Sequence, residues 1–117
     1  MKTIGIGLAG FGTVGAGVFD NLQHQRDLLA ERTGFIFDVR AIAVRDVEKY
    51  RKAAQEKHRD NAKNKNNAEL FTDSWRDLLS DPEIKIIVEL IGGTTDAYEL
   101  IKAAIESALK GAVPVSI

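Results

Sequence analysis

Six residues near the start of the chain form a glycine-rich pattern that is able to hold a phosphate group. The residues before it are apolar and those after it have helical spacing, so the glycines fall where a buried strand turns into a helix. In such a turn the first glycine allows a tight bend, the second leaves room for a pyrophosphate against the backbone, and the third lets the helix pack closely. The helix N-terminus then offers free N–H groups to the phosphates. The pattern predicts a dinucleotide site made of Gly10, Phe11, Gly12, Thr13, Val14 and Gly15.

A glycine-rich turn can also be selected only because it permits close packing. This alternative stays open for the six-residue pattern as far as the residues themselves go. Gly17, two positions further on, is interpreted in this way, as a packing glycine with no ligand role.

The end of the second expected strand bears on which dinucleotide is bound. NAD-binding domains usually place Asp or Glu there, where it bonds the adenosine ribose hydroxyls. Here the first charged residue is Arg45, and a guanidinium suits a ribose 2′-phosphate. Residues 45–67 carry eight Lys and Arg against four acids, a local net charge of +4, which leaves −5 for the rest. We predict NADP, read by Arg45, while Asp46 keeps NAD open and a plain solvated helix explains the basic residues equally well.

The hydrophobic pattern predicts alternating strands and helices. Strands are expected over 3–9, 35–44, 70–71, 84–91 and 113–117. One long helix is expected over 13–32, ending before Gly34 and burying Val14, Val18, Leu22 and Leu29, and a polar helix over 47–57. A short helix through Leu79 is expected to be capped by Thr72 or Asp73. The last helix is expected to start at Asp96, with Glu99 completing a capping box. Its apolar stripe is Ala97, Leu100, Ile101, Ala104, Ile105, Ala108 and Leu109.

This order predicts one α/β domain over 1–117, a Rossmann-type doubly wound parallel sheet in a three-layer α/β/α arrangement with strand order 3-2-1-4-5. Ligands of such sheets bind beyond the carboxyl ends of the strands where the strand order reverses. Gly92, Gly93 and Thr94 follow the fourth strand and are therefore expected beside the nicotinamide half of the cofactor. Glu89 within that strand is unexpected, because a carboxylate there costs free energy unless it is paired.

Composition excludes several other kinds of site. The net charge of −1 gives no overall field that would draw the chain to nucleic acid or a membrane, and no stretch approaches the roughly 20 apolar residues of a membrane span. The absence of Cys excludes disulfides, thiolate metal sites and a nucleophilic thiol. The two histidines, His24 and His58, are far apart, so no metal site is predicted. A cytoplasmic location is expected.

Three motifs together resemble a known family. Gly-Phe-Gly-Thr-Val-Gly at 10–15, Ile-Ala-Val-Arg-Asp at 42–46 and Val-Glu-Leu-Ile-Gly-Gly at 88–93, with Lys110-Gly111 after the next helix, look like the N-terminal NAD(P)-binding domain of homoserine dehydrogenase. The first motif is common to many dehydrogenases, and the second and third together are fairly specific. The resemblance implies NAD(P)-dependent interconversion of aspartate semialdehyde and homoserine, in threonine, methionine and isoleucine biosynthesis.

The sequence departs from this family at its end. The family continues after the fifth strand with Thr-Ala-Asn-Lys, and that Lys serves the reaction, whereas here Ser116 matches the Thr and Ile117 is the last residue. We therefore expect the cofactor domain of a larger oxidoreductase, with no catalytic residue in this chain and no activity in isolation. A stand-alone dinucleotide-sensing or regulatory module, and a structural domain with a vestigial site, stay open. The apolar fifth strand, blunted by Pro114, is expected to pair with a second copy as a weak homodimer.

Overall fold

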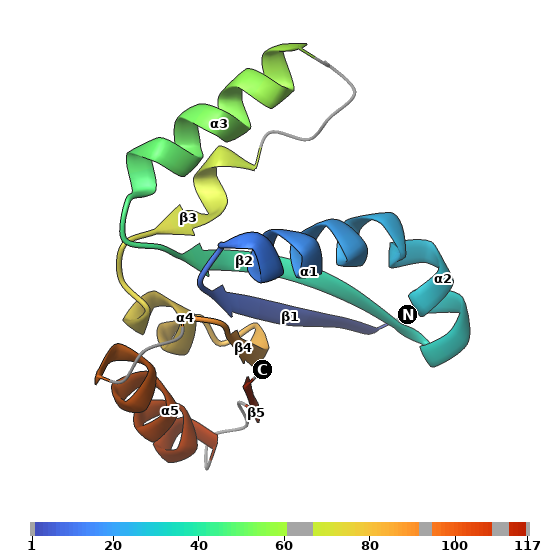
Figure 1. Ribbon diagram of the computed structural model, residues 1–117. Coiled ribbons are helices and arrows are strands. Elements are labelled where there is room, and N and C mark those ends of the chain that lie inside the picture. Colours follow the sequence, from blue (N-terminus) through green and yellow to red (C-terminus); the bar gives the residue numbers. More distant parts are fainter. Residues whose placement is uncertain (1, 61–66, 92–94, 109–112, 117) are drawn as a thin grey trace.

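The computed structural model describes residues 2–60, 67–91, 95–108 and 113–116 and contains one parallel sheet (Figure 1). Its order is β3-β2-β1-β4-β5, as predicted. Every neighbouring pair in this order is parallel. The strands are β1 (Lys2–Ala9), β2 (Phe35–Ala43), β3 (Phe71–Thr72), β4 (Ile84–Glu89) and β5 (Val113–Ser116). The expected Rossmann-type α/β fold is thereby confirmed.

Helices cover both faces of the sheet, which gives the three layers. The helices are α1 (Thr13–His24), α2 (Arg26–Thr33), α3 (Val47–Asp60), α4 (Arg76–Ser80) and α5 (Thr95–Ala108), with a 3-10 turn, η1 (Ala68–Leu70), before β3. Residues of α1 and α3 pack in one hydrophobic cluster, and residues of α4 and α5 pack in another. In Figure 1, α3 rises from the end of β2 and lies beside η1 and β3.

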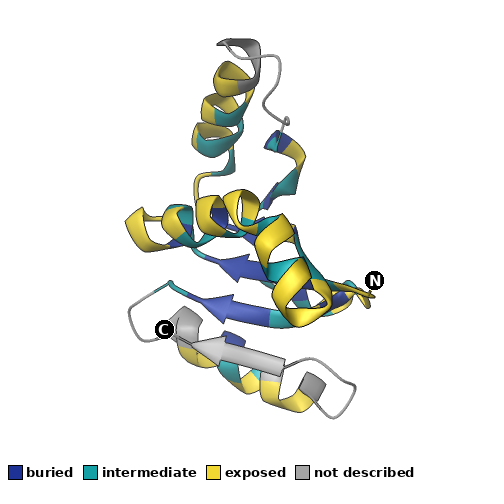
Figure 2. Cartoon of the chain, turned by 90° about the vertical axis from the view of Figure 1, so that its right-hand side faces the viewer, coloured by how far each residue is buried: buried dark blue, intermediate teal, exposed yellow. Residues whose placement is uncertain are grey.

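The two clusters take alternate residues of the same strands, because successive side chains of a strand point to opposite faces. In β4, Val88 joins the cluster below α1 and α3, whereas Ile87 joins the one below α4 and α5. Leu8 and Ile42 are fully buried in the first cluster, and Leu78, Ile87 and Leu100 are almost fully buried in the second. Figure 2 shows these buried strands between helices whose outer surfaces are exposed.

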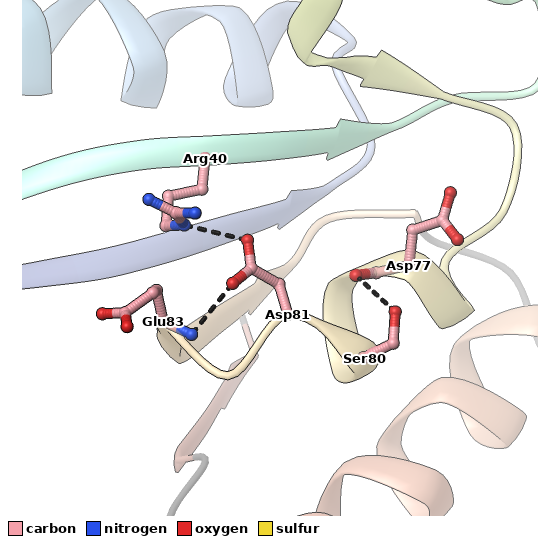
Figure 3. Close-up of polar contacts among 5 residues, drawn as sticks. All are labelled: Arg40, Asp77, Ser80, Asp81 and Glu83. Atoms are coloured by element: carbon pink, nitrogen blue, oxygen red, sulfur yellow. Dashed lines mark hydrogen bonds and ion pairs between the residues drawn. The ribbon is translucent and has the colours of Figure 1, made fainter.

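A polar clasp, formed by the Arg40 and Asp81 side chains and the Glu83 backbone, connects β2 to the segment before β4 (Figure 3). The Arg40 Nε donates to Asp81 Oδ2 at 2.8 Å, and the Glu83 N–H donates to Asp81 Oδ1 at 2.9 Å. The clasp passes over β1 at Gly5, where a side-chain carbon would collide with the Glu83 carbonyl oxygen and the Arg40 stem. Burial acts to raise the pKa of Asp81, but the hydrogen bonds from Arg40 and Glu83 outweigh it, so that pKa lies below its ordinary value.

The expected single helix over 13–32 is wrong, because the chain forms α1 and α2 with a break at Gln25. The His24 Nδ1 lies 2.8 Å from the Asp20 carbonyl oxygen and competes for an acceptor of the last turn. No residue of α2 is buried, so no apolar face holds α2 in line with α1. It instead runs back towards β2, where Arg26 and Asp38 form an ion pair at 3.6 Å. The stop at Gly34 is as expected, with a left-handed φ of 80°.

Two predicted helix starts are also wrong. The N-cap of α4 is Trp75, without a side-chain cap, because the Thr72 hydroxyl instead donates to the Asp77 carboxylate and accepts the Ser74 N–H. Helix α5 begins at Thr95, which places Asp96 inside the helix. Within its predicted stripe Leu100 is buried, but Ile105 is 58% exposed, since five residues further round an α-helix lie about 140° away. The side chains of Ala97, Ala104, Ala108 and Leu109 lie outside the described residues.

The Arg40–Asp81 clasp gives a stability prediction with a defined pH dependence. We expect Asp81→Asn to lower the free energy of unfolding by about 1 kcal/mol at pH 7, a modest value because both side chains are partly exposed. Since folding lowers the pKa of Asp81, the contribution is present above the ordinary carboxyl pKa and is lost as pH falls through the lowered value. Urea unfolding at pH 7 and near pH 2.5 measures both parts.

Glu31→Gln, which removes an exposed carboxylate on α2, is the matched control and should change stability by only a few tenths of a kcal/mol. An Asp81→Asn effect that is equally large near pH 2.5 would contradict the assignment of the stabilisation to the ionised carboxylate.

Candidate functional site

The carboxyl ends of β1 and β4 lie side by side, and this is where the strand order reverses. The last residues of the two strands, Ala9 and Glu89, are register partners. Beyond them the Leu90 N–H donates to the Ala9 carbonyl oxygen at 2.8 Å, and the Gly10 N–H donates to Ala43 of β2 at 2.8 Å. The glycine turn is therefore anchored by backbone hydrogen bonds to the ends of both flanking strands.

Two glycines of the turn are required by their surroundings. Gly10 has a φ of +109°, which L side chains rarely adopt, and a side-chain carbon there would lie 3.0 Å from the Leu90 carbonyl carbon. A carbon on Gly15 would lie 2.6 Å from the Gly10 carbonyl oxygen. The first turn of α1, the end of β1 and the segment after β4 thus meet backbone to backbone.

Gly12 is different, because a side-chain carbon there would meet no described atom within 4 Å. It is exposed and forms the N-cap of α1. The fold itself therefore does not require glycine at this position. The open space above Gly12 is the space that a pyrophosphate lying on the turn would use.

The amino end of α1 has the features of an anion site. Within the described part of the chain no side chain caps it, and its first turn contains no acidic residue. The N–H groups of this turn precede the first helical bond, from Ala16 N–H to Gly12 O at 2.8 Å, so they have no partner within the helix. Val14, expected on the buried face, is instead 58% exposed beside them, which corrects the helical pattern.

The Phe11 side chain points into the molecule, away from a ligand on the turn. Its ring makes edge-to-face contacts with Phe19, Tyr50 and Phe71, at centroid distances of 5.8, 5.6 and 5.1 Å. These four rings come from the glycine turn, α1, α3 and β3. The aromatic cluster therefore connects the glycine turn to α3 and β3, which follow β2 in the chain. Sequence reasoning missed this cluster, because residues this far apart in the chain show no common spacing.

A pocket of about 420 Å³ opens at the carboxyl ends of β2 and β3. Arg45, which the sequence predicts to read a ribose 2′-phosphate, lies on its wall. The pocket also contains three carboxylates and a second guanidinium, whose Nη2 donates to the Phe71 carbonyl oxygen at 3.0 Å. Its walls are therefore polar and of mixed charge. The lining residues are Arg45, Asp46, Val47, Glu48, Arg51, Thr72 and Asp73.

A larger groove, of about 750 Å³, lies between α1 and α3. Its floor is the aromatic cluster, and its walls include Gln23 and His24 of α1 and Lys57 of α3. Its lining comes mainly from α1 and α3. Size alone therefore does not mark it as the ligand site, and the glycine turn with the smaller pocket fits the rule for parallel sheets better.

Some expected site residues cannot be placed. Gly92, Gly93 and Thr94 lie outside the described residues, and so does every side chain from 92 to 97. Gly17 lies on the exposed side of α1, where a side-chain carbon would meet nothing within 4 Å, so its interpretation as a packing glycine is wrong.

Among the described helices none is long and apolar enough to cross a membrane.

Comparison with known protein sequences gives one consistent family. The sequence-family model described as the NAD-binding domain of homoserine dehydrogenase matches residues 10–114. The homoserine dehydrogenase of Pseudomonas aeruginosa is 37% identical over 107 residues, and that of Bacillus subtilis is 31% identical over the same length. Each alignment covers 92% of this chain but 22% of the relative. The chain thus spans about a fifth of the length of these curated relatives.

Solved structures agree with the sequence relatives. The homoserine dehydrogenase of Thiobacillus denitrificans superposes with a TM-score of 0.75 at 33% identity, over 99% of this chain and 23% of that one. The Staphylococcus aureus enzyme at pH 8.5 also gives a TM-score of 0.75, at 24% identity over 99% of this chain and 26% of that one. An apo levoglucosan dehydrogenase, at 21% identity and a TM-score of 0.61, shares the fold.

The match at 10–114 starts at the first glycine of the turn and runs into β5, so it includes the glycine turn, α1 and the end of β4, which border the crevice, while β1 lies outside it. The sequence relatives and the superposed structure of Thiobacillus denitrificans are all homoserine dehydrogenases. The chain therefore belongs to the homoserine dehydrogenase family and corresponds to the NAD-binding domain of these enzymes.

Proposed function

We propose that the glycine turn and the first turn of α1 hold the pyrophosphate of a nicotinamide dinucleotide. The observation that carries the proposal is the contrast between the glycines: Gly10 and Gly15 are needed by the fold, whereas Gly12 faces open space. The N–H groups of the first turn of α1, which have no partner within the helix, and the positive end of its dipole supply the attraction for the phosphates. Thr13 and Val14 are exposed at the same place and complete the contact surface.

The adenosine half of the cofactor belongs in the pocket at the ends of β2 and β3, and we propose NADP as the favoured form. The Arg45 guanidinium is suited to the 2′-phosphate. Asp46 is less available for a ribose, because its Oδ1 accepts the Lys49 N–H at 3.2 Å at the start of α3. The carboxylates on the pocket wall nevertheless oppose a phosphate, so NAD is the alternative.

The nicotinamide half would then extend towards the end of β4, where Gly92, Gly93 and Thr94 follow in the chain. The nicotinamide supplies or accepts a hydride, and this domain contributes its position and its electrostatic surroundings. For the longer protein we propose the reaction of the family, between aspartate semialdehyde and homoserine, and with it a role in threonine, methionine and isoleucine biosynthesis.

Two further expectations stay predictions. Strand β5 forms one edge of the described sheet, which favours pairing with a second copy. A cytoplasmic location agrees with the expected biosynthetic role.

Gly12→Val tests the pyrophosphate site. The added side chain meets no described neighbour, so the domain should fold, but its branches fill the space over the turn, and NADPH affinity should fall at least about a hundredfold. Gly17→Val is the matched control, because it adds the same side chain at another open position on α1 and should leave affinity within about twofold. Fluorescence titration with NADPH and thermal unfolding provide the two readouts. Tight NADPH binding by a folded Gly12→Val variant would reduce the turn to a structural role.

Arg45→Ala tests the choice of cofactor. Loss of a charge-assisted hydrogen bond to the 2′-phosphate should weaken NADPH by about 1.5–3 kcal/mol and NADH much less. Lys52→Ala removes an exposed charge from α3 outside the pocket and should change both affinities little. Equal losses for NADPH and NADH in Arg45→Ala would reject Arg45 as the residue that reads the phosphate.

The 117-residue chain alone should bind the cofactor without catalysing the family's reaction. The expected reason is that the groups for substrate binding and proton transfer belong to parts of the family that this chain does not span. Homoserine-dependent formation of NADPH, followed at 340 nm with a full-length relative as positive control, measures this. Turnover by the chain alone would show that the described crevice contains a complete active site.

A further inference from the structure

Glu89, the last residue of β4, is the one charged residue found buried within the described residues, with 7% of its surface exposed. A buried carboxylate is costly unless hydrogen bonds compensate it. Its Oε1 accepts the Ile91 N–H at 2.7 Å, a short bond to a charged acceptor. The carboxylate is therefore hydrogen-bonded to the backbone of the segment that follows its own strand.

That segment lies directly against the glycine turn. Gly10 approaches the Leu90 carbonyl group and the Ile91 nitrogen so closely that a side-chain carbon on Gly10 would lie 3.0 and 3.2 Å from them. The Ile91 nitrogen, which donates its hydrogen to Glu89, is thus also one of the atoms that leave no room for a side chain on Gly10. In the sheet register Glu89 is paired with Ala9, the residue just before the turn.

The side chains of this segment do not by themselves fix its backbone. Leu90 packs against the cluster below α1 and α3, whereas Ile91 packs against the cluster below α4 and α5. Apolar packing is non-directional and does not orient the intervening peptide group. The Leu90 N–H is held by Ala9, and the Glu89 carboxylate orients the next N–H, so the two hydrogen bonds together define how the chain passes the turn.

We infer that Glu89 is a positioning residue for the dinucleotide, which it affects through the backbone of Leu90 and Ile91 and through Gly10. The inference rests on the proposed function of the glycine turn and assigns a role to the carboxylate beneath it. By holding the 90–91 backbone against Gly10, Glu89 sets the position of the turn on which the pyrophosphate lies and from which the nicotinamide half extends. The adenosine pocket is built from the residues after β2, the start of α3 and the end of β3, so we expect it not to depend on Glu89.

The test compares Glu89→Gln with Glu89→Met in the 117-residue chain. Gln keeps an acceptor oxygen at the same distance along the side chain, whereas Met keeps the length and loses the strong acceptor. Two probes are titrated: NADPH, which spans the whole site, and adenosine 2′-monophosphate, which has neither pyrophosphate nor nicotinamide. Glu106→Met, which replaces an exposed carboxylate on α5, is the control.

We expect Glu89→Met to weaken NADPH about tenfold, the scale of one hydrogen bond, while its affinity for adenosine 2′-monophosphate stays within about twofold. Glu89→Gln and Glu106→Met should retain NADPH affinity within about twofold. Amide hydrogen exchange at Ile91 should be at least about tenfold faster in Glu89→Met than in the parent. If Glu89→Met does not fold, Glu89→Leu takes its place with the same expected results.

Unchanged NADPH affinity in a folded Met variant would overturn the role of Glu89, and so would equal losses for both probes, because these indicate a general structural effect. Equal weakening by Gln and Met would overturn the role of the acceptor oxygen. Failure of the parent chain to bind NADPH would instead refute the proposed function. In that case the exchange rate at Ile91 still decides whether Glu89 holds this backbone.

Discussion

The close approach of three backbone segments at one end of the sheet is the constraint on which the rest of this structure depends. The turn after β1, the first turn of α1 and the segment after β4 come so near that Gly10 and Gly15 leave no room for a side-chain carbon. Without this approach the amino end of α1 would stand away from the crevice. The N–H groups of its first turn, which have no partner within the helix, would then not face the place where the strand order reverses.

Two kinds of interaction maintain this arrangement. Backbone hydrogen bonds from Gly10 to Ala43 and from Leu90 to Ala9 fix the turn in the plane of the sheet. The Phe11 ring, packed among the other rings of the aromatic cluster, holds the turn from one face. Phe11 therefore contributes its backbone to the glycine turn and its side chain to the core, which explains why a large apolar residue is useful between two glycines.

Electrostatics divide the site into two parts. The glycine turn presents N–H groups without acidic side chains in the first turn of α1. The pocket at the ends of β2 and β3 mixes guanidinium groups with carboxylates, and Arg51 is engaged with the Glu48 carboxylate at 3.7 Å as well as with the Phe71 carbonyl. Under the proposed function, the pyrophosphate end would suit any dinucleotide, and discrimination between cofactors would depend on Arg45 against its acidic surroundings. The basic composition of 45–67 alone overstates the positive charge that this pocket presents.

The sequence by itself determined the strand order, the parallel sheet and the location of the glycine turn, because these follow from local patterns: apolar runs, helical spacing and glycines at a strand-to-helix junction. The family followed from the resemblance of three motifs to a known family. It did not determine the break at Gln25, the exposure of Val14 and Ile105, or the cap of α4, since each depends on which neighbours compete for a surface or a hydrogen bond. Only the tertiary structure distinguished Gly12 from Gly10 and Gly15, brought four aromatic rings together and gave the buried Glu89 a backbone partner. The physical reason is that these properties arise from contacts between segments far apart in the chain, and local spacing does not specify the distances between such segments.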